Sequence, residues 1–370
     1  MFVATEATSS FSSGKFEMKI HALASFKHYI DHIAPIWRSL DPDLTGNFVV
    51  NNLAMSRYAE SLGIYAQPMK QAGRLNFALR TQDPILVAGY TDLQKVHKRP
   101  IVFIEHGAGQ TYIRNDGSIH GGYSGGVNRD KIGFYVCPNE TVLQRNLKAY
   151  PDAQGIAVGS PRLDDLSFER KLAAPRNELN IGIAFHWDCN IAPEAGSAFS
   201  DFYYKIPEFV KYAQTCGMNI VGHGHPRAWS YLYGWWKDQK VRTESDWLKV
   251  SSEIDLLIID NSSILFEAAA LDIPVVLMES SKWRKNVHHG LRFWDYADIG
   301  PSVTKDDDLG EAISEAFHKK YAKRRKEASS AVYACPPMLD RMYQYSSTQD
   351  RLSSRRAAAE IIHWCQKGKR

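Results

Sequence analysis

The sequence predicts an α/β protein with two Rossmann-like domains, each built on a parallel sheet, that face each other across a cleft. Three observations support this prediction. Apolar runs without alternation, such as residues 256–259, are typical of strands that helices cover on both faces. Strand and helix patterns alternate along the chain. A polar stretch with a proline, at 171–179, separates two halves of similar size.

The domain boundaries follow from these composition changes. Residues 1–15 are rich in Ser and Thr, and we expect them to be a disordered lead-in. The remaining chain divides into a first, acceptor-side domain over 16–170, a linker over 171–179, a nucleotide-donor domain over 180–330, and C-terminal helices over 331–370 that return to the first domain.

The elements of the first half are predicted from hydrophobic periodicity and from turn residues. Residues 91–97 are expected to be a polar connection, and the glycine-rich segment 116–126 a loop. Helices are predicted over 24–40, 54–62 and 140–149, and strands over 48–50, 85–88, 100–105, 131–136 and 155–158.

The second half repeats the alternation. A helix is expected directly after Ser263, and a short element over 246–250. Strands are predicted over 181–185, 218–221, 256–259 and 273–278, and helices over 201–214, 306–317 and 351–364.

Composition narrows the function classes. With 370 residues, 44% hydrophobic residues and a formal net charge of +4, the chain is typical of a soluble globular protein and weakly suited to nucleic-acid binding. Its five cysteines show no CxxC spacing, which argues against a zinc site or a disulfide framework and for a reducing compartment. No apolar run reaches the roughly 18 residues of a membrane helix. We therefore expect a cytoplasmic protein.

The stretch 255–270 is a strand, a polar turn and a helix, and it predicts a nucleotide site. The free N–H groups at a helix start suit phosphate, so Asp260, Ser262 and Ser263 are candidate donor-binding residues. Glu267 follows about one helical turn later, where its carboxylate can accept hydrogen bonds from a ribose. The alternative interpretation is a capped helix after a core strand.

The strongest strand of the first half ends at a histidine. His106 follows the strand 100–105 and is succeeded by Gly107 and, three residues on, by Gln110. Ligands of open parallel sheets bind at the carboxyl ends of strands. His106 is therefore a candidate catalytic residue, with Gly107 and Gln110 as candidate acceptor-side residues.

Two strands of the second half also end in polar clusters. His186 and Asp188 follow the first strand, and His223, His225 and Arg227 follow the second. Arg227 can fork onto a phosphate. No carboxylate or cysteine completes a ligand set beside the His-x-His pair, so no metal is expected.

In order along the chain, five motifs together resemble the CDP-glycerol glycerophosphotransferases, the family that primes and polymerises teichoic acids and has a GT-B-type architecture. The motifs are His106–Gly107, the run 159–164, His225–Pro226, the stretch 260–267 and the run 293–301. The resemblance covers roughly residues 95–320.

The resemblance implies a role for each matching residue. His106 corresponds to the base that acts on the acceptor hydroxyl, and His225 to the histidine that supports the pyrophosphate or leaving group. Arg162 corresponds to a residue near the domain junction. The implied donor contacts are Ser262 and Ser263 to phosphate and Glu267 to ribose.

The sequence also departs from that family. Residues 185–188 read Phe-His-Trp-Asp where the family has Pro-Thr-Trp-Arg, and residues 108–111 read Ala-Gly-Gln-Thr where it has a Thr-Pro-Leu-Lys type of run. These departures concern the donor and the acceptor, so several functions stay open.

The first hypothesis is a transferase that moves glycerophosphate or a related polyol phosphate from CDP-glycerol to a hydroxyl acceptor, which can be a polymer or lipid-linked, without a tightly bound cofactor. An NDP-sugar glycosyltransferase is the alternative, acting on a polymer, a protein or a modified nucleic acid. A third hypothesis is an NDP-sugar 2-epimerase with Asp188, His223 and Glu105 as acid–base groups. A nucleotide-binding protein without catalysis is the fourth. The basic run 319–326 can contact an anionic surface, including the inner face of a membrane, or nucleic acid.

Overall fold

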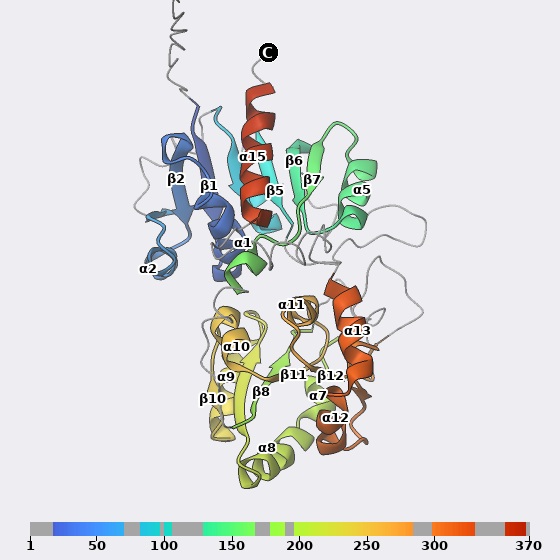
Figure 1. Cartoon of the computed structure of the whole chain (residues 1–370). Helices are drawn as coiled ribbons and strands as arrows, with labels where there is room; N and C mark the ends of the chain where they lie inside the picture. The colour runs from blue at the N-terminus through green and yellow to red at the C-terminus, as the bar shows by residue number, and fades with distance from the viewer. Residues whose placement is uncertain are drawn as a thin grey trace, which may run out of the picture.

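The computed structural model describes residues 18–69, 82–96, 100–105, 129–166, 178–188, 196–283, 298–329 and 352–367. These residues form two sheets, one of seven strands and one of six, and every strand pair in both is parallel. Helices cover the sheets, and the two domains lie one above the other in Figure 1. This arrangement confirms the predicted α/β fold of two Rossmann-like domains.

The first sheet has the strand order β3-β2-β1-β4-β5-β6-β7. The order of the strands, though not their direction, reverses between β1 and β4, and such a reversal is called the switch point of a sheet. Its strands are β1 Ile20–Ala24, β2 Thr45–Val50, β3 Ala66–Pro68, β4 Ile85–Val87, β5 Ile101–Ile104, β6 Ile132–Cys137 and β7 Gln154–Ala157. The helices around it are α1 Lys27–Trp37, α2 Leu53–Ser61, α4 Tyr90–Leu93, α5 Glu140–Ala149 and the 3₁₀ turns Pro42–Leu44 and Arg129–Lys131.

Strand β1 corrects the prediction of a helix from residue 24. All five of its residues are buried, and β1 pairs with both β2 and β4 at the middle of the sheet. The sequence pattern predicts no element over residues 20–23. The His21 ring is accommodated because it lies over Gly46 and accepts a hydrogen bond from the backbone N–H of Asn47 at 3.0 Å. The helix itself begins only at Lys27.

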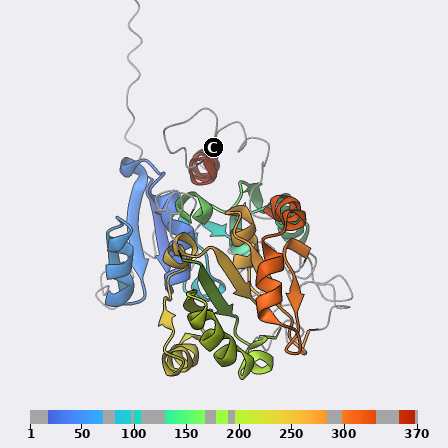
Figure 2. The ribbon, with the colours of Figure 1, turned by 60° about the horizontal axis from the view of Figure 1, so that its bottom comes forward.

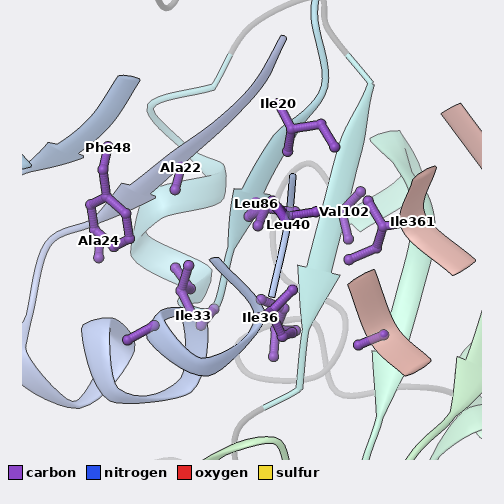
Figure 3. Close-up of a cluster of buried hydrophobic side chains, with 14 of the residues drawn as sticks. Ile20, Ala22, Ala24, Ile33, Ile36, Leu40, Phe48, Leu86, Val102 and Ile361 are labelled. Atoms are coloured by element: carbon purple, nitrogen blue, oxygen red, sulfur yellow. The ribbon is translucent and has the colours of Figure 1, made fainter. Parts of the chain in front are cut away.

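The core of the first domain explains why the C-terminus returns to it. Figure 3 shows side chains of α1 and β1 meeting those of the neighbouring strands. Ile361 and Cys365 of helix α15 (Leu352–Lys367) belong to the same cluster, although they lie more than 200 residues after Ala157, the end of the last strand of this sheet. Figures 1 and 2 show this red helix beside the first domain, as the sequence predicted.

The second sheet has the order β10-β9-β8-β11-β12-β13. Its strand order runs one way from β8 and the other way from β11, so the switch point of this sheet lies between these two parallel strands. Its strands are β8 Asn180–Phe185, β9 Asn219–Gly224, β10 Arg242–Thr243, β11 Leu256–Ile259, β12 Val275–Met278 and β13 Ser302–Val303. Its helices are α7 Phe199–Phe202, α8 Lys205–Thr215, α9 Trp229–Asp238, α10 Trp247–Glu253, α11 Ile264–Ala270, α12 Leu309–Ala316 and α13 Lys319–Ala328.

Several short elements are absent from the sequence prediction. The strands β3, β10 and β13 have two or three residues each, too few for a periodic signal. Helix α4 replaces part of the expected polar connection 91–97, because Leu93 is buried and Asp92 binds Ser25, in the loop between β1 and α1. Helix α9 was missed because its aromatic residues hide the helical period.

The segment 160–166 crosses from the first domain to the second. Leu163 and Leu166 are fully buried in the core of the second domain. The Asp164 carboxylate accepts a hydrogen bond at 2.9 Å from the backbone N–H of Ser354, in the first turn of α15. Asp165 forms an ion pair with Arg38. Residues 171–177 of the predicted linker, the lead-in 1–15 and the segment 116–126 lie outside the described residues.

Candidate functional site

Several predicted site residues lie at the switch point of the second sheet, between β8 and β11. Strands β8 and β11 are neighbours there, and ligands of such sheets bind beyond the carboxyl ends of the strands that flank the switch. The residues directly after these two strands, His186 and Asp260, are in contact, because an Asp260 carboxylate oxygen accepts a hydrogen bond from the His186 backbone N–H at 2.8 Å.

Asp260 is placed to hold loops together. Its other carboxylate oxygen accepts hydrogen bonds from the Ser197 hydroxyl at 2.8 Å and from the Ala198 backbone N–H at 2.9 Å. Burial raises the pKa of Asp260 to about 6, and these donors partly oppose that shift. These three donors all belong to the protein. Asp260 therefore shapes the binding surface around His186.

The two serines of the turn lie at the start of α11. Ser263 is the residue before the first helical position, and its side chain makes no capping hydrogen bond. The Ser262 hydroxyl accepts from the backbone N–H of Ile264 at 3.4 Å, a long hydrogen bond. Both serines are half-buried. The capping role that the sequence suggested is thus weak, and the serine hydroxyls remain candidate donor contacts.

Glu267 lies one turn further along α11 and is 4% exposed. Its Oε1 atom is 3.8 Å from the Arg162 guanidinium, whereas Oε2 is buried without a hydrogen-bond partner among the described residues. Burial raises the pKa of Glu267, and Arg162 and the Trp247 indole lower it in part. A buried carboxylate oxygen without a partner is costly, so this atom is suited to a hydroxyl donor from a ligand.

Arg162 connects the two domains. Beside Glu267 it also faces Asp31 of α1, at 3.9 Å. The Tyr58 hydroxyl donates a hydrogen bond to the Asp31 carboxylate. Burial raises the pKa of Asp31 to about 6, while Arg162 and Tyr58 oppose that shift. Sequence reasoning missed Asp31 because it lies within an amphipathic helix pattern that accounts for the segment without any function.

A second ion pair links the same two domains. Lys27, the first residue of α1, is 3.3 Å from the carboxylate of Asp246, and its ammonium group lies 4.3 Å from the centre of the Tyr58 ring. We call the surface where α1 meets the second domain the domain junction. It is made by Lys27, His28 and Asp31 on one side and by Arg162, His225, Asp246 and Glu267 on the other.

A group of imidazole and indole rings occupies the strand ends beside the junction. The ring centres of His186 and His225 are 4.7 Å apart, and those of Trp187 and His225 are 5.8 Å apart. The Arg227 guanidinium lies 4.5 Å from the centre of the Trp187 ring. This stacking holds the exposed arginine next to His225, where a guanidinium can bind phosphate oxygens.

Hydrogen bonds fix the tautomers of three of these histidines. A carbonyl only accepts, so the Nδ1–H groups of His186 and His223 donate to the carbonyls of Trp187 and Glu244, at 2.8 Å in each case. Burial lowers the pKa of both rings to about 4, which leaves them neutral with an accepting Nε2. His225 has the opposite tautomer, because its Nδ1 accepts a hydrogen bond from the Arg227 backbone N–H at 3.2 Å. Its neutral ring carries the proton on Nε2.

The remaining predicted residues have other partners or lie outside the described residues. Asp188 is exposed, forms an ion pair with Lys282 at 2.9 Å, and accepts a hydrogen bond at 2.9 Å from the backbone N–H of Ser197, next to Asp260. Glu105 is buried in the first domain, where it accepts from Arg129 at 2.8 Å and from Asn146 at 2.9 Å. His106, Gly107 and Gln110 fall outside the described residues.

The part of the chain that the structure describes has no group of three His, Cys, Asp or Glu residues arranged to hold a metal ion. It also has no helix long and apolar enough to cross a membrane.

The basic run 319–326 forms most of helix α13, and part of its charge is used within the protein. Arg324 pairs with Asp298 at 2.6 Å and also with Glu327. Arg325 is 5% exposed and pairs with Asp272 at 2.9 Å, and Lys320 pairs with Glu315. These residues therefore have roles in holding α13 to its surroundings.

The fold and the strand-end site define a two-domain α/β architecture of the GT-B type. Solved structures share it. One is S. aureus MnaA in a co-structure with UDP, with a TM-score of 0.61 and 12% identity, covering 94% of this chain and 97% of that one. Another is the wall teichoic acid polymerase TagF, with a TM-score of 0.60 and 15% identity, covering 94% of this chain and 89% of that one. The UDP-GlcNAc 2-epimerase of Neisseria meningitidis bound to UDP-GlcNAc is a further example, with a TM-score of 0.55 and 14% identity, covering 95% of this chain and 100% of that one. No protein-family model and no curated protein sequence matches the chain. At these identities the similarity establishes the fold.

Proposed function

We propose that this protein is a transferase that moves a glycerophosphate or related polyol phosphate group from CDP-glycerol to a hydroxyl acceptor. One observation supports this most strongly: His186, His225, Arg227 and Glu267 lie around the carboxyl ends of strands in the second sheet, beside its switch point. TagF, with which the chain shares its fold, is a CDP-glycerol glycerophosphotransferase polymerase. The sequence motifs independently favour the same class.

The donor would bind with its nucleoside toward Glu267 and its diphosphate toward His225 and Arg227. The buried Oε2 atom of Glu267 accepts a hydrogen bond from a ribose hydroxyl and so gains the hydrogen-bond partner that it lacks among the described residues. The Nε2–H of His225 and the guanidinium of Arg227 donate to the diphosphate. Ser262 and Ser263 add hydroxyl donors at the start of α11.

In the proposed reaction, the acceptor hydroxyl oxygen attacks the phosphorus that carries glycerol. A new P–O bond forms, the bond from that phosphorus to CMP breaks, and the hydroxyl proton passes to a base. We keep His106 as the proposed base, by its position after β5. The negative charge that develops on CMP is stabilised by His225 and Arg227, an electrostatic effect that often contributes the most to catalysis.

The proposal is tested by following CMP release from CDP-glycerol in the presence of a glycerol-phosphate-terminated acceptor. We expect turnover by the wild type, and a loss of roughly 10²–10³-fold when His225→Ala removes the donor to the leaving group. His363, an exposed histidine of α15, provides the matched control His363→Ala, which should turn over normally. CMP release that is unaffected by His225→Ala would contradict the assignment.

A nucleotide-sugar reaction is the second candidate, because the fold is shared with UDP-GlcNAc 2-epimerases. The acid–base set proposed for it is poorly supported, since Asp188 is paired with Lys282 and Glu105 is paired with Arg129. Conversion of UDP-GlcNAc without any acceptor would favour an epimerase. Sugar transfer from UDP- or GDP-sugars would favour a glycosyltransferase.

The partners of the proposed reaction follow from its chemistry. The donor acts as a substrate, and we propose no tightly bound cofactor. The acceptor carries a hydroxyl and can be part of a polymer or a lipid-linked molecule. Lys319 and Lys323 are exposed on α13, so contact with an anionic surface stays a proposal for this helix.

A further inference from the structure

His28 faces the imidazole cluster from the opposite domain. It is the second residue of α1, and the centre of its ring is 6.4 Å from that of His225. Burial raises the pKa of the neighbouring Tyr29 hydroxyl, and the charge of Arg227 is among the groups that oppose this shift. The start of α1 therefore lies within electrostatic range of Arg227. The motifs do not include His28, although it lies just beyond the carboxyl end of β1, which flanks the switch point of the first sheet.

The position of His28 is fixed by the loop before α1. The buried Asp92 carboxylate accepts hydrogen bonds from both the backbone N–H of Ser25, at 3.0 Å, and the Ser25 hydroxyl. Phe26 stacks on the His28 ring with centres 5.7 Å apart, and Tyr29 contacts the same ring edge-on at 4.2 Å. A ring that packs against two aromatic neighbours loses little freedom when it binds a ligand.

The surroundings of His28 suit an anion. Helix α1 has 11 residues, no acidic residue in its first turn and no side chain that caps its N-terminus. Its first residue, Lys27, is paired with Asp246. Across the junction lie His225 and Arg227. Hydrogen bonds to phosphate oxygens span about 2.7–3.2 Å, so two imidazoles with centres 6.4 Å apart can donate to the same diphosphate group.

We propose that His28 is a further donor-binding residue, which contacts the diphosphate of the nucleotide from the first domain while His225 and Arg227 contact it from the second. This inference rests on the proposed function for the identity of the ligand. It makes the diphosphate a bridge between the two domains. The nucleoside is held by the second domain, so nucleoside binding itself does not require His28.

Calorimetric titration tests this role with inorganic pyrophosphate, CDP and cytidine as probes. The variants are His28→Ala, His28→Gln, His225→Ala and the control His363→Ala. A hydrogen bond to a charged group contributes enough that His28→Ala should weaken CDP and pyrophosphate binding by about tenfold or more. Cytidine binding and His363→Ala should be unaffected, and His28→Gln, which keeps an N–H donor, should restore part of the loss. Circular dichroism of each variant checks the fold.

The outcomes separate this proposal from the function on which it rests. If His28→Ala binds CDP and pyrophosphate like the wild type while His225→Ala does not, the role of His28 is wrong and the proposed function stands. Pyrophosphate binding that depends on His28, with no binding of CDP, UDP or GDP, would support the anion site and contradict the nucleotide-donor function. If neither pyrophosphate nor any nucleotide binds the wild type, both are wrong.

Discussion

At the scale of single residues, the protein sets the chemical character of each histidine by the backbone group beside it. The Nδ1–H groups of His186 and His223 are committed to carbonyls, whereas Nδ1 of His225 is committed to an N–H group. The first two rings can thus accept a proton or a hydroxyl donor at Nε2, and the third can donate to a phosphate. Adjacent imidazoles with opposite tautomers can bind different parts of one substrate.

The depressed pKa of His223 predicts a specific pH dependence of stability. Burial lowers that pKa from 6.5 to about 4, with Arg162 acting in the same direction and Glu244 and Asp246 opposing. Between these values the unfolded chain binds a proton that the folded chain does not, so this histidine destabilises the fold as the pH falls. In His223→Asn the amide can replace the donor to Glu244, and this cost disappears.

We therefore expect the stability of His223→Asn relative to wild type to improve by roughly 2–3 kcal/mol between about pH 7 and about pH 4.5. Urea unfolding of both proteins at the two pH values measures this difference. The raised pKa values of Asp31 and Asp260 make the fold more stable as the pH falls. This contribution is the same in both proteins, so it cancels from the difference between their stabilities. An equal stability difference at the two pH values would show that His223 titrates normally in the fold.

At the scale of elements, α1 and α11 are joined through one guanidinium. Arg162 has a side chain that is 12% exposed, and its two counterions, Asp31 and Glu267, are on different domains. Lys27 and Asp246 add a second link between α1 and the N-terminus of α10. The elements that carry the proposed donor contacts are thus held in place by charges rather than by a shared apolar core.

Removing this guanidinium should be costly. Arg162→Ala leaves two buried carboxylates without their counterion, and we expect a loss of about 3–5 kcal/mol in the free energy of unfolding. The pair between Lys282 and Asp188 is exposed, so Lys282→Ala should change stability by about 1 kcal/mol at most. Urea unfolding curves compare the two variants. Similar small losses in both would mean that Arg162 does not bridge the domains.

The elements also show what sequence patterns can resolve. Strands such as β5 and β11 were predictable because they are apolar runs buried on both faces. Strand β1 was not predicted, because two of its five residues are alanines and one is a histidine, for which the approach of Gly46 makes room. His225 and Glu267 were identified by position, but Asp31 and His28 belong to the site only through contacts between domains. A single amphipathic helix carries no signal for such contacts.

At the scale of the whole molecule, the buried hydrophobic clusters of the described residues separate by domain, two belonging to the first and two to the second, and this separation predicts two unfolding units. The last helix, α15, belongs to the first unit although the second domain precedes it in the chain. Ile361 of α15 and Leu257 of β11 are both completely buried, each in the core of a different domain. Substitution of a buried aliphatic residue by alanine typically costs about 2–5 kcal/mol.

We expect scanning calorimetry to resolve two transitions, one for each domain. Ile361→Ala should lower the transition temperature of the first domain, and Leu257→Ala should lower that of the second. Each substitution serves as the control for the other. A single transition that both substitutions move equally would show that the ionic junction couples the domains into one cooperative unit.

The central claim is that the second domain binds a nucleotide whose ribose contacts Glu267, and a thermal-shift panel tests it most directly. The panel contains CDP-glycerol, CMP, UDP, GDP and UDP-GlcNAc, with wild type and Glu267→Gln. A ligand at about 100 times its Kd adds ~2.7 kcal/mol of stability, which shifts the melting temperature measurably. We predict stabilisation by the cytidine compounds in the wild type and its loss in Glu267→Gln. A wild type that no nucleotide stabilises, or stabilisation that persists in the variant, would contradict this account.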